Sequence, residues 1–113
     1  MTYTTLIAAE TLQQHQGNPQ WAIFDVRHYL MDTTAGARAY AAGHIPGAQF
    51  AGIDADLSGA KDGSNGRHPL PPRAALVERF RAWGIASDTQ IVAYDAQGGQ
   101  LAGRLWWLAR WLG

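Results

Sequence analysis

A loop able to hold an anion follows one of the two long apolar runs of the sequence. Asp95 comes directly after the run Gln90–Tyr94 and leads through Gly98 and Gly99 into a helical pattern. Free backbone N–H groups and the helix dipole at such a position can bind sulfate, phosphate or a thiolate. The Asp95 carboxylate would accept hydrogen bonds from those donors and repel an incoming anion. The spacing therefore favours a capping carboxylate over an anion site.

A pair of opposite charges follows the other apolar run. Asp25 and Arg27 lie two residues apart at the end of Trp21–Val26, on one side of the expected strand and near solvent. We expect an ion pair that anchors a loop, not acid/base catalysis. Glycine-rich phosphate loops, nucleophile elbows and dinucleotide-binding fingerprints are absent from the sequence.

Four histidines could suggest a metal site: His15, His28, His44 and His68. None has the i, i+3 or i+4 spacing of helical metal ligands, so neither a metal nor another cofactor is predicted. His44 precedes Ile45, Pro46 and Gly47, where its imidazole is expected to hydrogen-bond the backbone of a tight turn. His68 is expected to hold the loop around it in the same way.

The composition excludes several functional classes. The chain has 113 residues and no cysteine, so it forms no disulfide and offers no cysteine nucleophile. Nine basic residues balance nine acidic ones, which disfavours nucleic-acid and membrane partners. No apolar run reaches about 18 residues and no signal peptide is recognised, so we expect one cytoplasmic domain.

Strand and helix patterns alternate along the chain. Strands are predicted at Leu6–Ile7, 21–26, Gln49–Phe50 and 90–94, and helices at 12–16, 35–42, 72–84 and 100–112, with a long loop over 52–72. This order predicts an α/β domain with a mainly parallel sheet between helical layers. Ligands of such sheets bind beyond the carboxyl ends of the strands, which directs attention to the loops after Val26 and Tyr94.

Two tryptophans of the last helix lie off its apolar stripe. Trp107 and Trp111 are one turn apart, on the face that also carries Arg104 and Arg110. Two interpretations remain open. The pair forms a buried second layer of the same domain, or it forms a docking surface for another domain or subunit.

Several motifs in order resemble the rhodanese family of sulfurtransferases. They are DVR at 25–27, Tyr40 followed by GHIPGA at 43–48, the stretch 54–57, GRHPLP at 66–71, VAYD at 92–95 and RLWWLARWLG at 104–113. The likeness spans nearly the whole chain. It is closest to the first, noncatalytic domain of the tandem-domain thiosulfate and 3-mercaptopyruvate sulfurtransferases.

The resemblance implies a role beside a catalytic domain. In the family, sulfane sulfur passes from thiosulfate or mercaptopyruvate to an acceptor through a cysteine persulfide in the second domain. Asp95 occupies the matching position here, and a carboxylate cannot carry that sulfur, so the chain alone is expected to be inactive. The resemblance makes Arg27, His28, His44, Trp107 and Trp111 candidates for the cleft or the domain interface.

The resemblance also implies a domain, residues 1–113, truncated at its C-terminal end. Rhodanese domains continue with one more strand, which lies inside the sheet beside the strand 90–94, and one more helix. We therefore expect an unpaired edge on that strand. A second chain could fill it by domain swapping, in a homo-oligomer or as the other piece of a split protein; alternatively, the pairing is rearranged.

The sequence leaves three functions as alternatives. The first is a noncatalytic rhodanese-like domain that packs against a cysteine-bearing domain of a sulfurtransferase. The second is a free-standing rhodanese-fold module that binds a partner or an anion without sulfur transfer. The third, phosphate-ester hydrolysis with Asp95 as nucleophile, requires a metal ion or basic clamp that the sequence does not offer.

Overall fold

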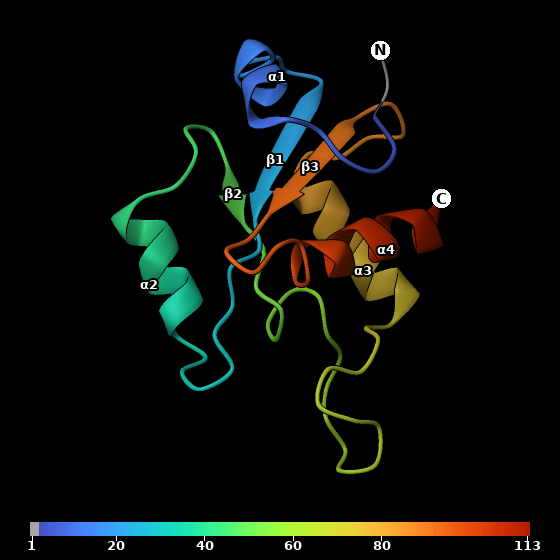
Figure 1. Ribbon diagram of the computed structural model, residues 1–113. Coiled ribbons are helices and arrows are strands. Elements are labelled where there is room, and N and C mark those ends of the chain that lie inside the picture. The colour runs from blue at the N-terminus through green and yellow to red at the C-terminus, as the bar shows by residue number, and fades with distance from the viewer. Residues whose placement is uncertain (1–2) are drawn as a thin grey trace.

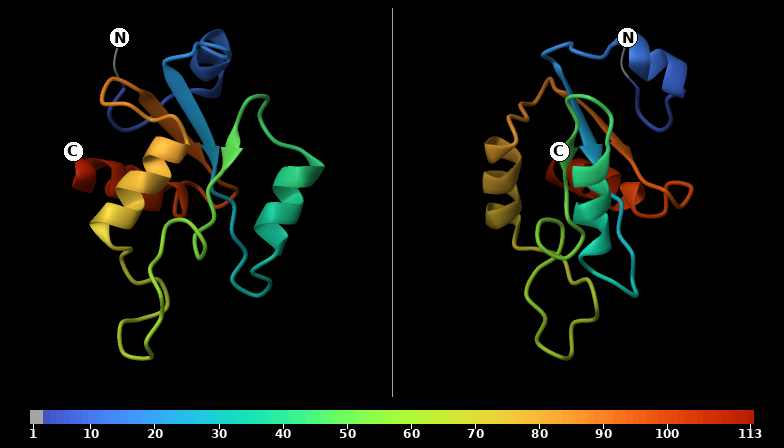
Figure 2. Two further views of the ribbon diagram at one scale, coloured as in Figure 1. Left: turned by 180° about the vertical axis from the view of Figure 1, so that it is seen from behind. Right: turned by 90° about the vertical axis from the view of Figure 1, so that its left-hand side faces the viewer.

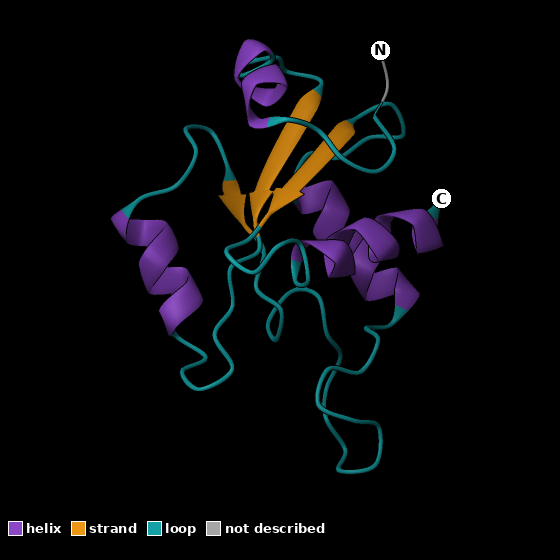
Figure 3. Ribbon diagram, in the orientation of Figure 1, coloured by secondary structure: helices purple, strands orange, loops and turns teal. Residues whose placement is uncertain are grey.

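The computed structural model describes residues 3–113 and contains a small parallel sheet with helices around it (Figures 1 and 3). The elements in chain order are α1 (Ala9–Gln14), β1 (Trp21–Asp25), α2 (Ala35–Ala42), β2 (Gln49–Phe50), α3 (Arg73–Ala82), β3 (Gln90–Tyr94) and α4 (Ala102–Leu112). None of the helices within residues 3–113 has the length and apolar character needed to cross a membrane.

The sheet has the order β2-β1-β3, and both pairs are parallel. β1 pairs with β3 along its full length, from Trp21 opposite Gln90 to Asp25 opposite Tyr94. The carboxyl ends of all three strands therefore meet at one edge, from which the loops of interest leave (Figure 1).

Alternate residues of β1 enter two separate cores. Phe24 packs with Leu76 and Phe80 of α3 and Leu105 of α4. Ile23 packs on the opposite face, against the cluster that includes Leu12 of α1. Because neighbouring strand residues point to opposite faces, helices cover both sides of the sheet, as Figure 2 shows from the side. The predicted α/β architecture with a parallel sheet between helical layers is confirmed.

The end of α3 illustrates how the sequence sets an element boundary. Gly84 adopts a φ of +80°, and the N–H of Ile85 donates to the carbonyl of Phe80 at 3.0 Å. This is the hydrogen-bond pattern of a glycine-terminated helix, and the predicted stop at Gly84 is confirmed.

The predicted strand at Leu6–Ile7 is wrong, since these residues form no ladder. Instead, side chains hold the segment before them: the amide of Gln90 bonds both backbone groups of Tyr3, and the indole of Trp106 bonds the carbonyl of Thr4. A strand needs a neighbour to pair with, and among residues 3–113 none lies beside this segment. The first helix also differs, because it begins at Ala9 and ends at Gln14.

Candidate functional site

The loop after β3 is built around the carboxylate of Asp95. One oxygen, Oδ1, accepts 2.9 Å hydrogen bonds from the backbone N–H groups of Gln97 and Gly99. The other, Oδ2, accepts 2.7 Å bonds from those of Leu101 and Ala102 at the start of α4. The carboxylate thus occupies the anion cradle of the helix start, as the sequence predicted.

Two glycines give this loop its shape. Gly98 and Gly99 have φ values of +69° and +93°, a region that other residues rarely adopt. Burial raises the pKa of Asp95, but the backbone hydrogen bonds together outweigh it, so the pKa lies below its ordinary value. The carboxylate is therefore held ionised inside a ring of donors.

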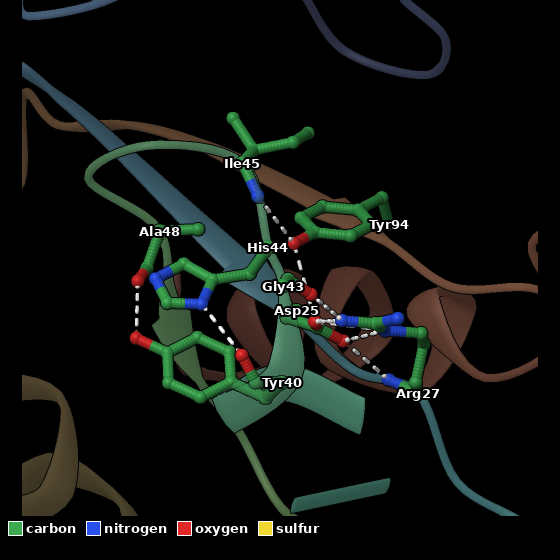
Figure 4. Close-up of polar contacts among 8 residues, drawn as sticks. All are labelled: Asp25, Arg27, Tyr40, Gly43, His44, Ile45, Ala48 and Tyr94. Carbon is green, nitrogen blue, oxygen red and sulfur yellow. Dashed lines mark hydrogen bonds and ion pairs between the residues drawn. The ribbon is translucent and has the colours of Figure 1, made fainter. Parts of the chain in front are cut away.

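The loop after β1 begins with a buried ion pair (Figure 4). Asp25 is fully buried, so the prediction that it reaches solvent is wrong. Its carboxylate accepts bonds from Nε of Arg27 at 2.9 and 3.0 Å and from Nη2 at 2.5 Å. The ion pair itself was predicted, and its hydrogen bonds raise the pKa of Arg27.

The same pair ties β1 to the turn before β2. Nη2 of Arg27 also donates to the carbonyl of Gly43 at 2.6 Å, and the hydroxyl of Tyr94 joins Asp25 to the N–H of Ile45. Burial raises the pKa of Tyr94 and keeps its proton available for this bond. The guanidinium of Arg27 is therefore engaged in holding the loop.

His44 holds the turn before β2. Its ring stacks on Tyr40 with centroids 3.8 Å apart, and its Nδ1 lies 2.7 Å from the carbonyl oxygen of Tyr40 (Figure 4). The hydroxyl of Tyr40 in turn donates to the carbonyl of Ala48. This is the turn-holding role that the sequence predicted for His44.

A pocket of about 390 Å³ lies beside these loops, beyond the carboxyl end of β1. Its lining is basic and partly apolar: His28, Leu30, Met31, Thr33, Asp54, Lys61, Arg67 and His68. His28 is only 8% exposed, and its Nε2 is buried without a hydrogen-bond partner. The pocket thus contains a buried polar atom whose bonding capacity is unused.

The second histidine of the pocket faces an acid. Nδ1 of His68 lies 3.1 Å from Oδ1 of Asp54, close enough for an ion pair but without the alignment of a hydrogen bond. The rings of His28 and His68 meet edge to face with centroids 5.7 Å apart. Two histidines, a lysine and an arginine against one carboxylate favour a negatively charged occupant.

Contacts from the loop after β3 and from α4 position this pocket. The side-chain amide of Gln97, in the Asp95 loop, donates to the carbonyl of His28 at 3.1 Å. Arg104 of α4 donates to the carbonyls of Leu57, His68 and Pro69 at 2.9 to 3.2 Å, and burial lowers its pKa. The pocket and the Asp95 loop are therefore neighbouring parts of one surface.

The structure gives the two tryptophans of α4 different environments. Trp107 is 45% exposed, whereas Trp111 packs against the main core under the guanidinium of Arg73. Their rings still stack, with centroids 5.8 Å apart. Trp111 therefore forms the second layer of the core that one interpretation predicted, whereas the docking role of the exposed Trp107 stays a prediction.

Of the residues that line the pocket, only His28 was a candidate from the sequence. The position of the others in the pocket was not predicted: Asp54, Lys61, Arg67 and His68. The available signal was the GRHPLP motif inside a long loop, because long loops in compact domains often carry function. Among the described residues, no three His, Asp or Glu side chains are grouped as metal ligands.

Comparisons with known proteins agree on one family. A family model described as "Rhodanese-like domain" matches residues 8–113. The "Probable 3-mercaptopyruvate sulfurtransferase" of Pseudomonas aeruginosa is 43% identical over 114 residues, covering 100% of this chain and 40% of that protein. The 3-mercaptopyruvate sulfurtransferase of Escherichia coli K12 is 32% identical, again over 100% of this chain and 40% of the relative.

A solved structure has the same fold. The 3-mercaptopyruvate sulfurtransferase from Leishmania major superposes with a TM-score of 0.82 at 31% identity, over 89% of this chain and 28% of that one. The chain thus spans between 28% and 40% of the length of these three relatives.

Proposed function

The chain belongs to the family of rhodanese-like domains, and we propose that it is a noncatalytic domain of a thiosulfate or 3-mercaptopyruvate sulfurtransferase. In this role it packs against a cysteine-bearing domain and forms one wall of the cleft in which that cysteine carries sulfur. The relatives are much longer than this chain, which is consistent with a companion domain in the same polypeptide.

The observation that carries the proposal is the occupied cradle at Asp95. A sulfurtransferase of this family needs a thiolate that accepts sulfane sulfur and releases it again. Here four backbone N–H groups already bind the carboxylate oxygens, and the sequence has no cysteine. Carboxylate oxygen forms no persulfide, so the chain can shape the site while another domain holds the sulfur.

The pocket around His28 and His68 gives this domain something to contribute. Thiosulfate and mercaptopyruvate are anions, and the basic side chains of Lys61 and Arg67 would favour them at the cleft wall. Leu30 and Met31, 57% and 97% exposed at the rim, together with Trp107, supply apolar surface for contact with the companion domain.

The proposal assigns different roles to the remaining candidates. His28 lines the pocket, whereas Arg27 and His44 act indirectly by holding the loops around it. Trp111, half-buried against the core, supports Trp107 by stacking on it. The proposal places the domain in the cytoplasm and assigns it no cofactor.

The basic pocket also supports a second candidate function. A free-standing module could use it to bind an anion with no link to sulfur transfer. To separate the two functions, the part of the Pseudomonas relative that lies outside the matched region is produced as a fragment and mixed with the 113-residue chain. The rate at which the fragment transfers sulfur from thiosulfate or mercaptopyruvate to cyanide is then measured with and without this chain. A noncatalytic sulfurtransferase domain is expected to raise the rate of that fragment, and Arg67→Ala to reduce the gain.

The matched control for that experiment is Arg38→Ala, which removes an arginine whose partner is the exposed Asp32, outside the pocket. If the 113-residue chain leaves the rate of the fragment unchanged but binds thiosulfate through Arg67, the module function replaces the proposal.

A further inference from the structure

An asparagine followed by a glycine lies in the long loop between β2 and α3, which projects away from the sheet (Figure 1). Asn65 and Gly66 are both exposed. Gly66 adopts a φ of +88°, and a Cβ there would meet nothing within 4 Å. Its backbone N–H makes no hydrogen bond to another group within residues 3–113. The nitrogen that follows the Asn65 side chain is therefore unhindered and accessible to water.

Such a nitrogen can react with the amide beside it. After losing its proton, the nitrogen of Gly66 attacks Cγ of Asn65, so that a C–N bond forms and the side-chain nitrogen leaves as ammonia. Water then opens the cyclic imide at either of its two carbonyl groups and leaves an aspartate or an isoaspartate at position 65. The reaction consumes one water, releases one ammonia and changes no oxidation state.

The Asn65 side chain is held only by contacts at the surface. Its Nδ2 donates to the carbonyl of Ala60 at 3.0 Å, and its Oδ1 accepts a 3.1 Å bond from the N–H of Asp62. Both bonds are exposed, so water can replace them at little net cost. The side chain can therefore turn toward Gly66 through a local opening that leaves the domain folded.

Neighbouring sequences show why Asn65 is singled out. The other asparagine of the sequence is Asn18, and Pro19 follows it. Proline has no backbone N–H, so the same attack cannot occur there. Asp62 also precedes a glycine, but hydrogen bonds from the N–H and hydroxyl of Ser64 and from the N–H of Asn65 lower its pKa. Its carboxylate stays ionised, which makes it a poor target for a nucleophile.

The reaction would change the charge beside the basic pocket. Lys61 and Arg67, which line that pocket, flank Asn65 along the loop. The product has a carboxylate in place of the amide, so the donor to the carbonyl of Ala60 is lost and two oxygens face each other. The new negative charge also offsets one of the two basic side chains.

We propose that Asn65 is a site of spontaneous deamidation and that its conversion weakens the hold of the basic pocket on anions. The modification itself follows from the loop alone. Its effect on anions rests on the proposed function, because it presupposes that the pocket binds them.

The first test is a peptide map of the aged chain. The 113-residue chain is incubated at about pH 6 and about pH 8, and we expect faster conversion at the higher pH because the attacking nitrogen must lose its proton. Peptides produced in acid are weighed by mass spectrometry, and isoaspartate is detected by enzymatic methylation of its carboxyl group. The Asn65 peptide should gain the mass difference between NH2 and OH, while the Asn18 peptide keeps its mass. Equal conversion at both asparagines, or none at Asn65, would overturn the proposal.

Glycine variants identify the attacking nitrogen. Gly66→Ala should slow the conversion of Asn65 at least about tenfold, because a Cβ hinders the close approach that glycine permits. Gly63→Ala is the matched control, since Gly63 lies in the same loop, also has a φ of +88° and also has nothing within 4 Å of a Cβ. This control should slow the conversion less than about twofold. Equal rates in wild type and Gly66→Ala would contradict the proposal.

Asn65→Asp makes one product directly and tests the effect on the pocket. Its Kd for thiosulfate, measured by titration calorimetry at low salt, should be about two- to fivefold higher than that of wild type. Gln13→Glu makes the same chemical change at an exposed position of α1, outside the pocket, and should leave the Kd unchanged. An equal Kd for Asn65→Asp and wild type would refute the effect on anions. If wild type binds no thiosulfate, the anion pocket of the proposed function fails and this effect with it, whereas the peptide map still decides the modification.

Discussion

The carboxylate of Asp95 accepts a 2.7 Å hydrogen bond from the backbone N–H of Ala102, the first residue of α4. With three more backbone donors around it, this acid fills the position at which an anion could otherwise bind. The loop is therefore arranged for a negative charge but supplies that charge itself.

This arrangement predicts a loss of stability in acid. The folded pKa of Asp95 is depressed, so its stabilisation is fully present above the unfolded value of about 3.9 and disappears as pH falls through the folded pKa. Asp95→Asn cannot ionise and should lower the free energy of unfolding at pH 7 by about 1 to 3 kcal/mol. The difference from wild type, measured by urea unfolding, should shrink toward pH 2. An equal difference at both pH values would contradict the assignment.

Asp95→Cys should yield a thiol of unusually low pKa. The four N–H groups that bind the carboxylate would stabilise a thiolate, so the pKa should fall below the ordinary value of about 8.5. Because the sequence has no other cysteine, the rate of alkylation by iodoacetamide against pH reports this thiol alone. Ser87→Cys, on an exposed turn, is the control. A pKa no lower than that of the control would show that the donors do not act on a thiolate.

Arg27→Ala should be strongly destabilising. It leaves the fully buried carboxylate of Asp25 without its charged partner, which typically costs about 3 to 5 kcal/mol. Arg38→Ala breaks a solvent-exposed pair with Asp32 and should cost less than about 1 kcal/mol. Chemical denaturation of the two variants measures how much free energy of unfolding each one loses. Losses of similar size would refute the structural role of Arg27.

Two glycines in helices should respond to alanine in opposite directions. A Cβ at Gly36 would lie 2.2 Å from the carbonyl oxygen of Arg27, so Gly36→Ala must push α2 away from the loop after β1 and should cost about 1 to 3 kcal/mol. Nothing lies within 4 Å of a Cβ at Gly103 in α4, and there alanine should add about 0.5 to 1 kcal/mol. Thermal unfolding measures both effects. Stabilisation by Gly36→Ala would show that α2 does not pack as described.

Elements whose signal is local were predictable from the sequence. The continuous apolar runs became β1 and β3, and Gly84 ended α3 as expected. Leu6–Ile7 was predicted to be a strand from its residue types, but pairing depends on a neighbour that the described chain does not supply.

In the candidate site, too, only the features with a local signal were predictable. The capping role of Asp95 follows from its position before Gly98 and Gly99, a local pattern. The rings of His28 and His68 are forty positions apart in the sequence and meet because Arg104 holds the loop that carries His68. Hydrophobic periodicity does not indicate a contact of this kind. The exposure of Trp107 but not Trp111 depends likewise on where Arg73 lies.

Mass spectrometry of the purified chain after incubation with thiosulfate or mercaptopyruvate tests the central claim most directly. The account predicts an unchanged mass and no transfer of sulfur to cyanide, because no side chain of this sequence can form a persulfide. A covalent gain of one sulfur atom on the chain, or turnover by the chain unaided, would contradict it.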